Sequence, residues 1–275
     1  MESFDEPHVA RSCLSPTTSG GRRAVLLTAD GVRIDAAYDP PDGERDVAIV
    51  VAHGFTGALE RPAVRRAAQV FSGYGGVVTF SFRGHGRSGG RSTVGDREVL
   101  DLTAAVGWAR SLGYARVATV GFSMGGSVVL RHAAGAEGDA DRGVDGGVDA
   151  VASVSAPARW YYRGTAPMRR VHWAITRPAG RLVSRVGLGT RIHSAEWDPV
   201  PLSPVEAVPL IAPTPLLIVH GDRDGYFPVD HPLSLAAAAG GAADLWLEPG
   251  FGHAENAAEP ELLRRIGAWV AARTA

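Results

Sequence analysis

The 275-residue sequence is poor in several residue types, and each scarcity excludes a class of protein. It has one cysteine, Cys13, and no lysine, so its 28 basic residues are all arginine. A single cysteine excludes an intrachain disulfide and suits a reducing compartment, so we expect a cytoplasmic protein. No apolar stretch is long enough to cross a membrane, and residues 1–22 lack the apolar core of a signal peptide. We therefore expect no membrane span.

The sequence also has almost no excess charge of either sign. Its 28 basic and 29 acidic residues give a formal net charge of −1. Without a basic excess, nothing in the composition indicates a nucleic-acid partner or an acidic membrane. Hydrophobic residues make up 45% of the chain and charged residues 21%, which is enough apolar material for a sizeable core. The composition predicts a globular protein that does not bind nucleic acid.

Apolar runs alternate with amphipathic stretches along most of the chain. Runs typical of strands buried in a parallel sheet cover residues 46–54, 75–84, 116–122, 149–157, 215–222 and 243–250. Helical patterns cover about 59–72, 97–113, 124–134 and 260–274. Asp30-Gly31, between two alternating segments, predicts a two-residue hairpin. This order predicts an α/β fold with a mostly parallel, doubly wound sheet flanked by helices and opened by an antiparallel hairpin.

We expect one domain over residues 23–275, preceded by a loosely held N-terminal arm over residues 1–22. Two segments interrupt the alternation of strands and helices. Residues 135–149 are rich in glycine and aspartate and predict a flexible surface loop. Residues 156–212 are rich in arginine, proline and aromatics and fit no single strand or helix. Because a long insertion in a compact domain is usually functional, we expect this segment to form a cap over the site.

Ser123 lies in the string Gly-Phe-Ser-Met-Gly, between a predicted buried strand and a predicted helix. Serine is common in turns, so the string alone is weak support for catalysis. In this context a tight turn would hold the serine oxygen at the carboxyl edge of the sheet, where Gly121 and Gly125 allow a close approach. The following helix offers unpaired N–H groups to a developing negative charge. Ser123 is therefore the candidate nucleophile, and an ordinary turn serine is the alternative.

A serine nucleophile needs a base to remove its proton and an acid to orient that base. Asp222 and Asp224 follow one predicted strand, and His253 follows the last strand beside turn-forming glycines. The chain order is serine, acid, histidine, each just past a strand, which is the order expected on this kind of sheet. The residues themselves leave Asp222 and Asp224 open as the acid, with Glu248 as a further candidate.

The remaining histidines of these motifs are interpreted as structural. His53 opens a turn, and His85 and His220 are expected to brace loops through hydrogen bonds. His132 falls inside a predicted helix and is expected to be packed or exposed. The histidine and aspartates near residue 220 could be mistaken for a metal site, but no further ligand set accompanies them. We therefore expect neither a metal nor a cofactor.

Taken together, the motifs resemble those of the α/β-hydrolase fold, specifically the esterase, lipase and peptidase-like group with a small helical cap. The matching strings are HGFTG (53–57), FRGHGRSGG (82–90), GFSMGG (121–126), HGDRD (220–224) and GFGH (250–253). The resemblance covers residues 24–273 and implies a serine triad without naming a substrate. It places the acid on Asp224 and an oxyanion hole on the backbone N–H groups of Phe55 and Met124. Ser81 departs from the family, in which an acidic residue is common, and this bears only on loop bonding.

These residues predict a serine hydrolase that cleaves a carboxylic ester, or a related acyl bond, of a small and largely apolar substrate through an acyl-serine intermediate. An acyltransferase or thioesterase, or a cofactor-free perhydrolase, could use the same residues, and a binding protein on a hydrolase fold is the non-enzymatic alternative. Serine at position 123 disfavours an epoxide hydrolase or dehalogenase, which would need aspartate there.

The segment 156–212 is expected to supply the substrate-binding surface. Its aromatic residues are Trp160, Tyr161, Tyr162, Trp173 and Trp197. We expect most of them to pack the segment onto the body, and one or two to face the cleft as an apolar binding surface. Its arginines either meet an anionic group of a substrate or form a solvated helix face.

Overall fold

The computed structural model describes residues 15–16, 21–135 and 147–275. Cys13, most of the expected N-terminal arm and residues 136–146 of the expected surface loop lie outside the described residues. The arm contributes a short strand, β1 (Ser15–Pro16), which pairs with Arg22 and Arg23 at the sheet edge. Within the described ranges, no helix is both long enough and apolar enough to cross a bilayer.

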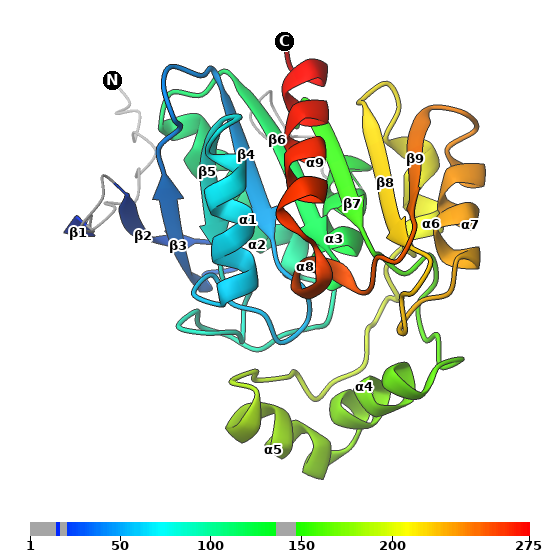
Figure 1. Ribbon diagram of the computed structural model, residues 1–275. Helices are drawn as coiled ribbons and strands as arrows, with labels where there is room; N and C mark the ends of the chain where they lie inside the picture. Colours follow the sequence, from blue (N-terminus) through cyan, green and yellow to red (C-terminus); the bar gives the residue numbers. More distant parts are fainter. Residues whose placement is uncertain (1–14, 17–20, 136–146) are drawn as a thin grey trace, which may run out of the picture.

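A single nine-stranded sheet, in the order β1-β2-β3-β5-β4-β6-β7-β8-β9, forms the centre of the molecule (Figure 1). Its other strands are β2 (Arg22–Leu27), β3 (Arg33–Asp39), β4 (Val47–Ala52), β5 (Gly76–Phe80), β6 (Arg116–Phe122), β7 (Ala150–Val154), β8 (Leu216–Gly221) and β9 (Ala243–Glu248). All residues of β4 to β8 except the first of β6 are buried, as their continuous apolar runs predicted. Strands β4 to β9 are parallel, and β1 to β3 join antiparallel, which confirms the predicted fold class.

Helices cover both faces of this sheet (Figure 1). One face carries α1 (Pro62–Phe71), α8 (Ala254–Ala257) and α9 (Pro260–Arg273), and the other carries α2 (Glu98–Ser111), α3 (Met124–Ala133), α6 (Pro204–Ala207) and α7 (Asp230–Ala238). Each longer helix turns its apolar residues toward the sheet, because burying that stripe is the main source of helix stability in a protein. The predicted helices are all present, with ends shifted by at most three residues.

The connection between β2 and β3 is longer than the predicted two-residue hairpin, so that prediction is wrong. Strand pairing ends at Leu27 opposite Arg33, and the turn closes with a hydrogen bond from the Gly31 N–H to the Thr28 carbonyl. The Asp30 carboxylate accepts from the Thr28 hydroxyl and also binds a distant arginine. The Thr28 N–H still donates to the Val32 carbonyl, so the loop has three residues, and Gly31 at φ 78° takes the one left-handed position that such a loop needs.

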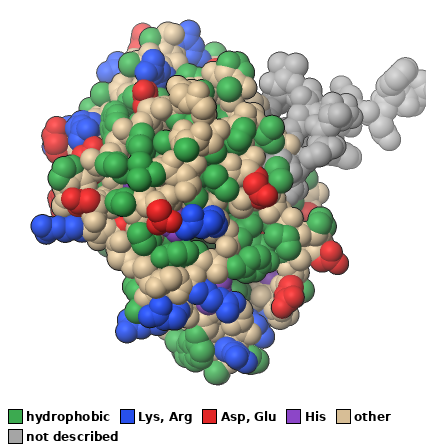
Figure 2. All heavy atoms as spheres, turned by 90° about the vertical axis from the view of Figure 1, so that its right-hand side faces the viewer, with side chains coloured by type: hydrophobic (Ala, Val, Ile, Leu, Met, Phe, Trp, Pro, Cys, Tyr) green, Lys and Arg blue, Asp and Glu red, His purple; other side chains and the backbone are tan. Residues whose placement is uncertain are grey.

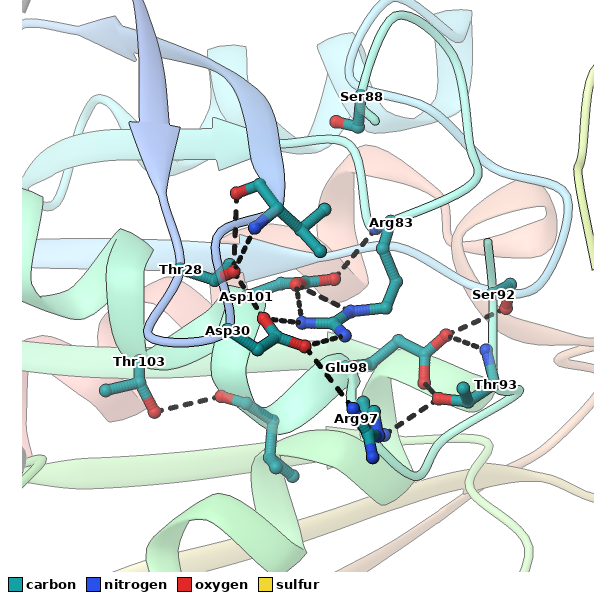
Figure 3. A network of polar contacts seen from close by, with 12 residues as sticks. Thr28, Asp30, Arg83, Ser88, Ser92, Thr93, Arg97, Glu98, Asp101 and Thr103 are labelled. Atoms are coloured by element: carbon teal, nitrogen blue, oxygen red, sulfur yellow. Dashed lines mark hydrogen bonds and ion pairs between the residues drawn. The ribbon is translucent and has the colours of Figure 1, made fainter. Parts of the chain in front are cut away.

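That arginine, Arg83, anchors the loop that follows β5 (Figure 3). Its guanidinium binds Asp30 through two nitrogens at 2.7 and 3.0 Å and Asp101 of α2 through Nε at 2.9 Å. Further along the same loop, the Glu98 carboxylate accepts hydrogen bonds from residues 92–95. The loop is thereby fixed to the first turn of α2.

Two helices of the expected cap segment lie away from the sheet, at the bottom of Figure 1. These are α4 (Ala166–Thr176), which has no buried residue, and α5 (Pro178–Gly187). The later part of the segment, α6 and the 3-10 turn η1 (Val208–Leu210), instead packs on the body. The portion that forms the cap is therefore shorter than residues 156–212.

Candidate active site

Ser123 lies on a strained turn between β6 and α3. Its backbone has φ 53° and ψ −114°, a region that residues with a side chain rarely adopt. A Cβ at Gly121 would lie 2.2 Å from the Gly125 carbonyl oxygen, and one at Gly125 would lie 2.2 Å from that of Ala52. Only glycine fits at either position, and the Ser123 N–H is held by the Val154 carbonyl at 2.8 Å. The turn therefore places the serine side chain at the carboxyl edge of the sheet.

The structure brings Ser123, His253 and Asp224 into one hydrogen-bonded chain. His253 Nε2 lies 2.9 Å from Ser123 Oγ, and His253 Nδ1 lies 2.8 Å from Asp224 Oδ2. With the proton on Nδ1 donated to the carboxylate, Nε2 is left to accept from the serine hydroxyl. Each residue follows a different strand, β6, β8 or β9, so the parallel order of the sheet brings them together.

The side chain of Asp224 is buried, and it is the charged member of this hydrogen-bonded triad. Burial raises the pKa of its carboxyl group, but the hydrogen bond to His253 and the electrostatic interaction with this side chain lower it more, so the pKa stays below its ordinary value. The N–H groups of Tyr226 and Phe227 also donate to Oδ1, at 2.8 and 3.1 Å. An ionised carboxylate is therefore held against the imidazole in a fixed orientation.

The two other candidate acids bind elsewhere. Asp222 Oδ1 accepts a hydrogen bond from the Gly250 N–H at 2.6 Å, which joins the loops after β8 and β9. Glu248 forms an ion pair of 2.7 Å with Arg265 on the surface of α9. Of the three acids that the sequence left open, Asp224 is the one that contacts His253 among the described residues.

Three of the histidines interpreted as structural, His53, His85 and His220, bind backbone groups, and His132 is buried in α3. His53 is buried, its Nδ1 donates to the Gly54 carbonyl at 2.7 Å, and its Nε2 accepts from the Phe82 N–H at 3.0 Å. Burial, with a smaller effect of the nearby His85, lowers the pKa of His53 to about 3. His53 is therefore neutral and joins two loops beneath the site.

Phe55 and Met124 lie beside Ser123, and the sequence predicted that their backbone N–H groups form an oxyanion hole. In the part of the chain that the structure describes, the N–H groups of Phe55 and Met124 donate no hydrogen bond. Met124 is the first residue of α3, so its N–H has no partner within the helix. Both residues line the same cavity as Ser123. Their N–H groups can donate hydrogen bonds to a negatively charged oxygen bound beside Ser123.

The sequence analysis missed two residues of the site. Glu255 is buried, and its Oε1 accepts a hydrogen bond of 2.9 Å from the N–H of Gly54, the residue directly before Phe55. Tyr226 stacks on the His253 ring with centroids 4.2 Å apart. Each lies two residues after a candidate catalytic residue, and that proximity is the only sequence feature that could have indicated them.

A cavity of about 630 Å³ opens above Ser123 and is roofed by the cap. Its apolar and aromatic lining includes Phe55, Met124 and Phe227 from the body and Trp160, Tyr161, Tyr162, Met168, Val171, Trp173 and Leu188 from the cap. Four of the five cap aromatics thus face the cavity, more than expected, while Trp197 packs behind Trp160 with ring centroids 5.1 Å apart. The lining suits an apolar group next to the serine.

No protein-family model and no curated protein match the sequence, whereas many solved structures match its fold. The esterase Pf2001 of Pyrococcus furiosus is 21% identical with a TM-score of 0.71, covering 98% of this chain and 100% of that one. Est1E from Butyrivibrio proteoclasticus, solved with ferulic acid bound, is 20% identical with a TM-score of 0.60, covering 91% and 99%. XC6422 from Xanthomonas campestris, described as an α/β serine hydrolase without a lid, is 19% identical with a TM-score of 0.58, covering 98% and 96%. The chain has the α/β-hydrolase fold.

Proposed function

We propose that the protein is a serine hydrolase that cleaves a carboxylic ester, or a related acyl bond, of a small and largely apolar substrate. The observation that carries this proposal is the hydrogen-bonded chain Ser123–His253–Asp224 at the floor of the aromatic cavity. The similarity in fold to Pf2001, which is described as an esterase, supports ester cleavage.

In the first step, Ser123 Oγ attacks the carbonyl carbon of the substrate while His253 Nε2 removes the hydroxyl proton. Asp224 holds the imidazole in the required tautomer and stabilises the imidazolium that forms. The N–H groups of Phe55 and Met124 donate hydrogen bonds to the negatively charged carbonyl oxygen, and each donor lowers the barrier by about 3 kcal/mol. The bond to the leaving oxygen then breaks, His253 returns the proton to that oxygen, and the acyl group stays on Ser123.

In the second step, water attacks the acyl-serine carbonyl, and His253 removes a proton from this water. The same two N–H groups stabilise the second oxyanion. When it collapses, the bond to Ser123 Oγ breaks, the serine regains its proton from His253, and the acid product leaves. The aromatic roof holds the acyl group and limits the access of bulk water to the reaction.

The test is a panel of p-nitrophenyl esters of increasing chain length, with a thioester alongside. We expect the protein to hydrolyse the esters and to be labelled once by a fluorophosphonate, and Ser123→Ala to abolish both. Ser234→Ala, on α7 outside the cavity, is the matched control and should retain both. Labelling that survives in Ser123→Ala would identify a different nucleophile. Inactivity of the protein across the whole panel would favour a binding protein or an acyltransferase with a specialised acceptor.

A further inference from the structure

The positive charge of this protein is concentrated in the cap. Residues 157–195 contain no aspartate or glutamate and eight arginines, namely Arg159, Arg163, Arg169, Arg170, Arg177, Arg181, Arg185 and Arg191. The rest of the chain therefore carries a formal charge of −9, although the total is only −1. The near-neutral sum, which gave no indication of an anionic partner, conceals a strongly cationic end of the molecule.

Most of this charge is uncompensated. Within the described residues, none of the arginines from 163 to 185 forms an ion pair with a carboxylate, whereas Arg159 is paired with Asp230 at 2.6 Å. Arg169, Arg170, Arg177 and Arg185 are exposed. Figure 2 shows basic side chains beside apolar ones over the lower end of the molecule, where the cap lies.

Helix α5 presents an apolar strip on the same cap. Leu182, Val183 and Val186 are 61%, 53% and 78% exposed, and they form one strip because Val186 follows Leu182 by four positions and Val183 by three. The opposite side is closed, since Gly180 packs against the backbone of α4 and Ser184 is buried. A cluster of aliphatic side chains facing water is uncommon on a monomer and marks a surface that another phase or molecule covers.

Two features connect this surface to the cavity. Trp173 of α4 and Tyr161 line the cavity and are also 47% and 57% exposed, so they form part of its rim. Arg170 and Leu188, both exposed, belong to the same lining. The cationic, apolar outer surface of the cap therefore continues into the mouth of the cavity.

We propose that the cap docks on an anionic phospholipid bilayer, with Leu182, Val183 and Val186 inserted at the boundary between headgroups and acyl chains. The arginines bind the lipid phosphates, and the aromatic rim lies at the depth that tryptophan and tyrosine prefer. In this orientation the cavity mouth faces the lipid, so an apolar ester could enter without crossing water. Docking itself does not depend on the proposed hydrolase activity.

The surface fits a bilayer better than other partners. A nucleic acid would use the arginines but would leave Leu182 and Val186 in water. A second copy of the chain could cover the apolar strip, but it would bring two caps of like charge together, which is unfavourable. An anionic bilayer suits both the arginines and the apolar strip. Each arginine near such a surface is attracted to the lipid phosphates, and the strip is removed from water.

The test uses co-sedimentation of the full chain carrying Ser123→Ala, so that hydrolysis plays no part, with phosphatidylcholine vesicles that contain or lack one-third phosphatidylglycerol. We expect binding to the anionic vesicles and a partition coefficient at least about tenfold lower for neutral ones. Leu182→Ser/Val186→Ser and Arg177→Gln/Arg185→Gln should each weaken binding to the anionic vesicles by about tenfold or more. Circular dichroism should show that both variants remain folded.

Matched controls lie on the body. Val229→Ser/Leu233→Ser changes two exposed aliphatic residues with the same four-residue spacing near α7, and Arg264→Gln/Arg273→Gln removes two exposed arginines of α9. Both should bind like the parent protein. The proposal is overturned if the parent does not sediment with anionic vesicles or if Leu182→Ser/Val186→Ser binds unchanged. It is also overturned if sedimentation-velocity centrifugation shows that the parent protein is a dimer and that Leu182→Ser/Val186→Ser is a monomer.

Discussion

The backbone N–H of Gly54 donates a hydrogen bond of 2.9 Å to Oε1 of Glu255, which lies 201 residues further along the chain. Gly54 precedes Phe55, one of the two proposed oxyanion donors, and Glu255 follows His253 by two residues. The buried carboxylate therefore ties the turn after β4 to the loop that carries the proposed base. A Cβ at Gly54 would lie 3.2 Å from this carboxylate and 3.3 Å from Ser123 Cβ, so the packing around the bond is tight.

Removing this carboxylate should weaken catalysis more than binding. Glu255→Ala leaves the Gly54 N–H without a partner and frees the turn that presents Phe55, so we expect kcat to fall about tenfold with KM little changed. Glu255→Gln keeps a side-chain oxygen as acceptor and should restore most of kcat. Steady-state kinetics on a p-nitrophenyl ester measure both, with Glu261→Ala, which changes a 75% exposed carboxylate, as control. An unchanged kcat in a folded Glu255→Ala protein would contradict this role.

Asp224 and Asp222 should differ sharply in kinetics. Asp224→Asn retains the shape of the side chain but favours the wrong tautomer of His253, so we expect kcat to fall about 10⁴-fold. Asp222→Asn disturbs only the hydrogen bond to the Gly250 N–H and should cost far less. The comparison of kcat for the two variants is the measurement. A greater loss in Asp222→Asn would transfer the orienting role to that residue.

The Arg83–Asp101 pair should contribute strongly to stability. Both side chains are buried, and Arg83→Met would leave the Asp101 carboxylate without its counter-ion, which typically costs about 3–5 kcal/mol. Urea denaturation followed by circular dichroism gives the free energy of unfolding. Arg264→Met, which breaks an exposed ion pair with Glu261, should change it by about 1 kcal/mol or less. Equal effects of the two substitutions would show that burial of the Arg83 pair is unimportant.

Acid should destabilise the fold through the buried His53. Burial lowers the pKa of His53 to about 3 from its ordinary 6.5, so between these values the unfolded chain binds a proton that the folded chain does not. The free energy of unfolding should therefore fall as pH drops from 6.5 toward 3, by up to about 1.4 kcal/mol per pH unit from this residue. Above 6.5 this contribution to stability is fully present.

The measurement is urea denaturation at a series of pH values. His53→Gln lacks the titrating group, so its free energy of unfolding should depend less steeply on pH in this range, whatever its absolute stability. His193→Gln, which changes an exposed histidine, should keep the slope of the parent protein. A slope that is the same in His53→Gln as in the parent would assign the acid sensitivity to other groups.

Local pattern in the sequence was enough to predict the sheet and the position of Ser123. The apolar runs of β4 to β8 can be buried only in a sheet covered on both faces. In the turn around Ser123, positions 121 and 125 have room for glycine alone. The Asp30-Gly31 prediction gave the wrong loop length, because only Gly31 takes the left-handed conformation, which suits a three-residue loop, whereas a two-residue loop of this type needs two such residues. The boundaries of the cap were also set by packing, since α6 covers the body.

The sequence by itself determined the strand order in the chain, the nucleophile candidate and the presence of acids and a histidine after later strands. Tertiary structure decided which acid contacts His253, that Glu255 holds the Gly54 turn, and which aromatics reach the cavity. These choices join residues 29 to 201 positions apart, and they depend on strand order, loop path and burial, none of which leaves a local pattern. The cationic cap depends on both the sequence and the tertiary structure. Its arginines can be counted in the sequence, whereas its exposed apolar strip and its position at the cavity mouth exist only in the folded chain.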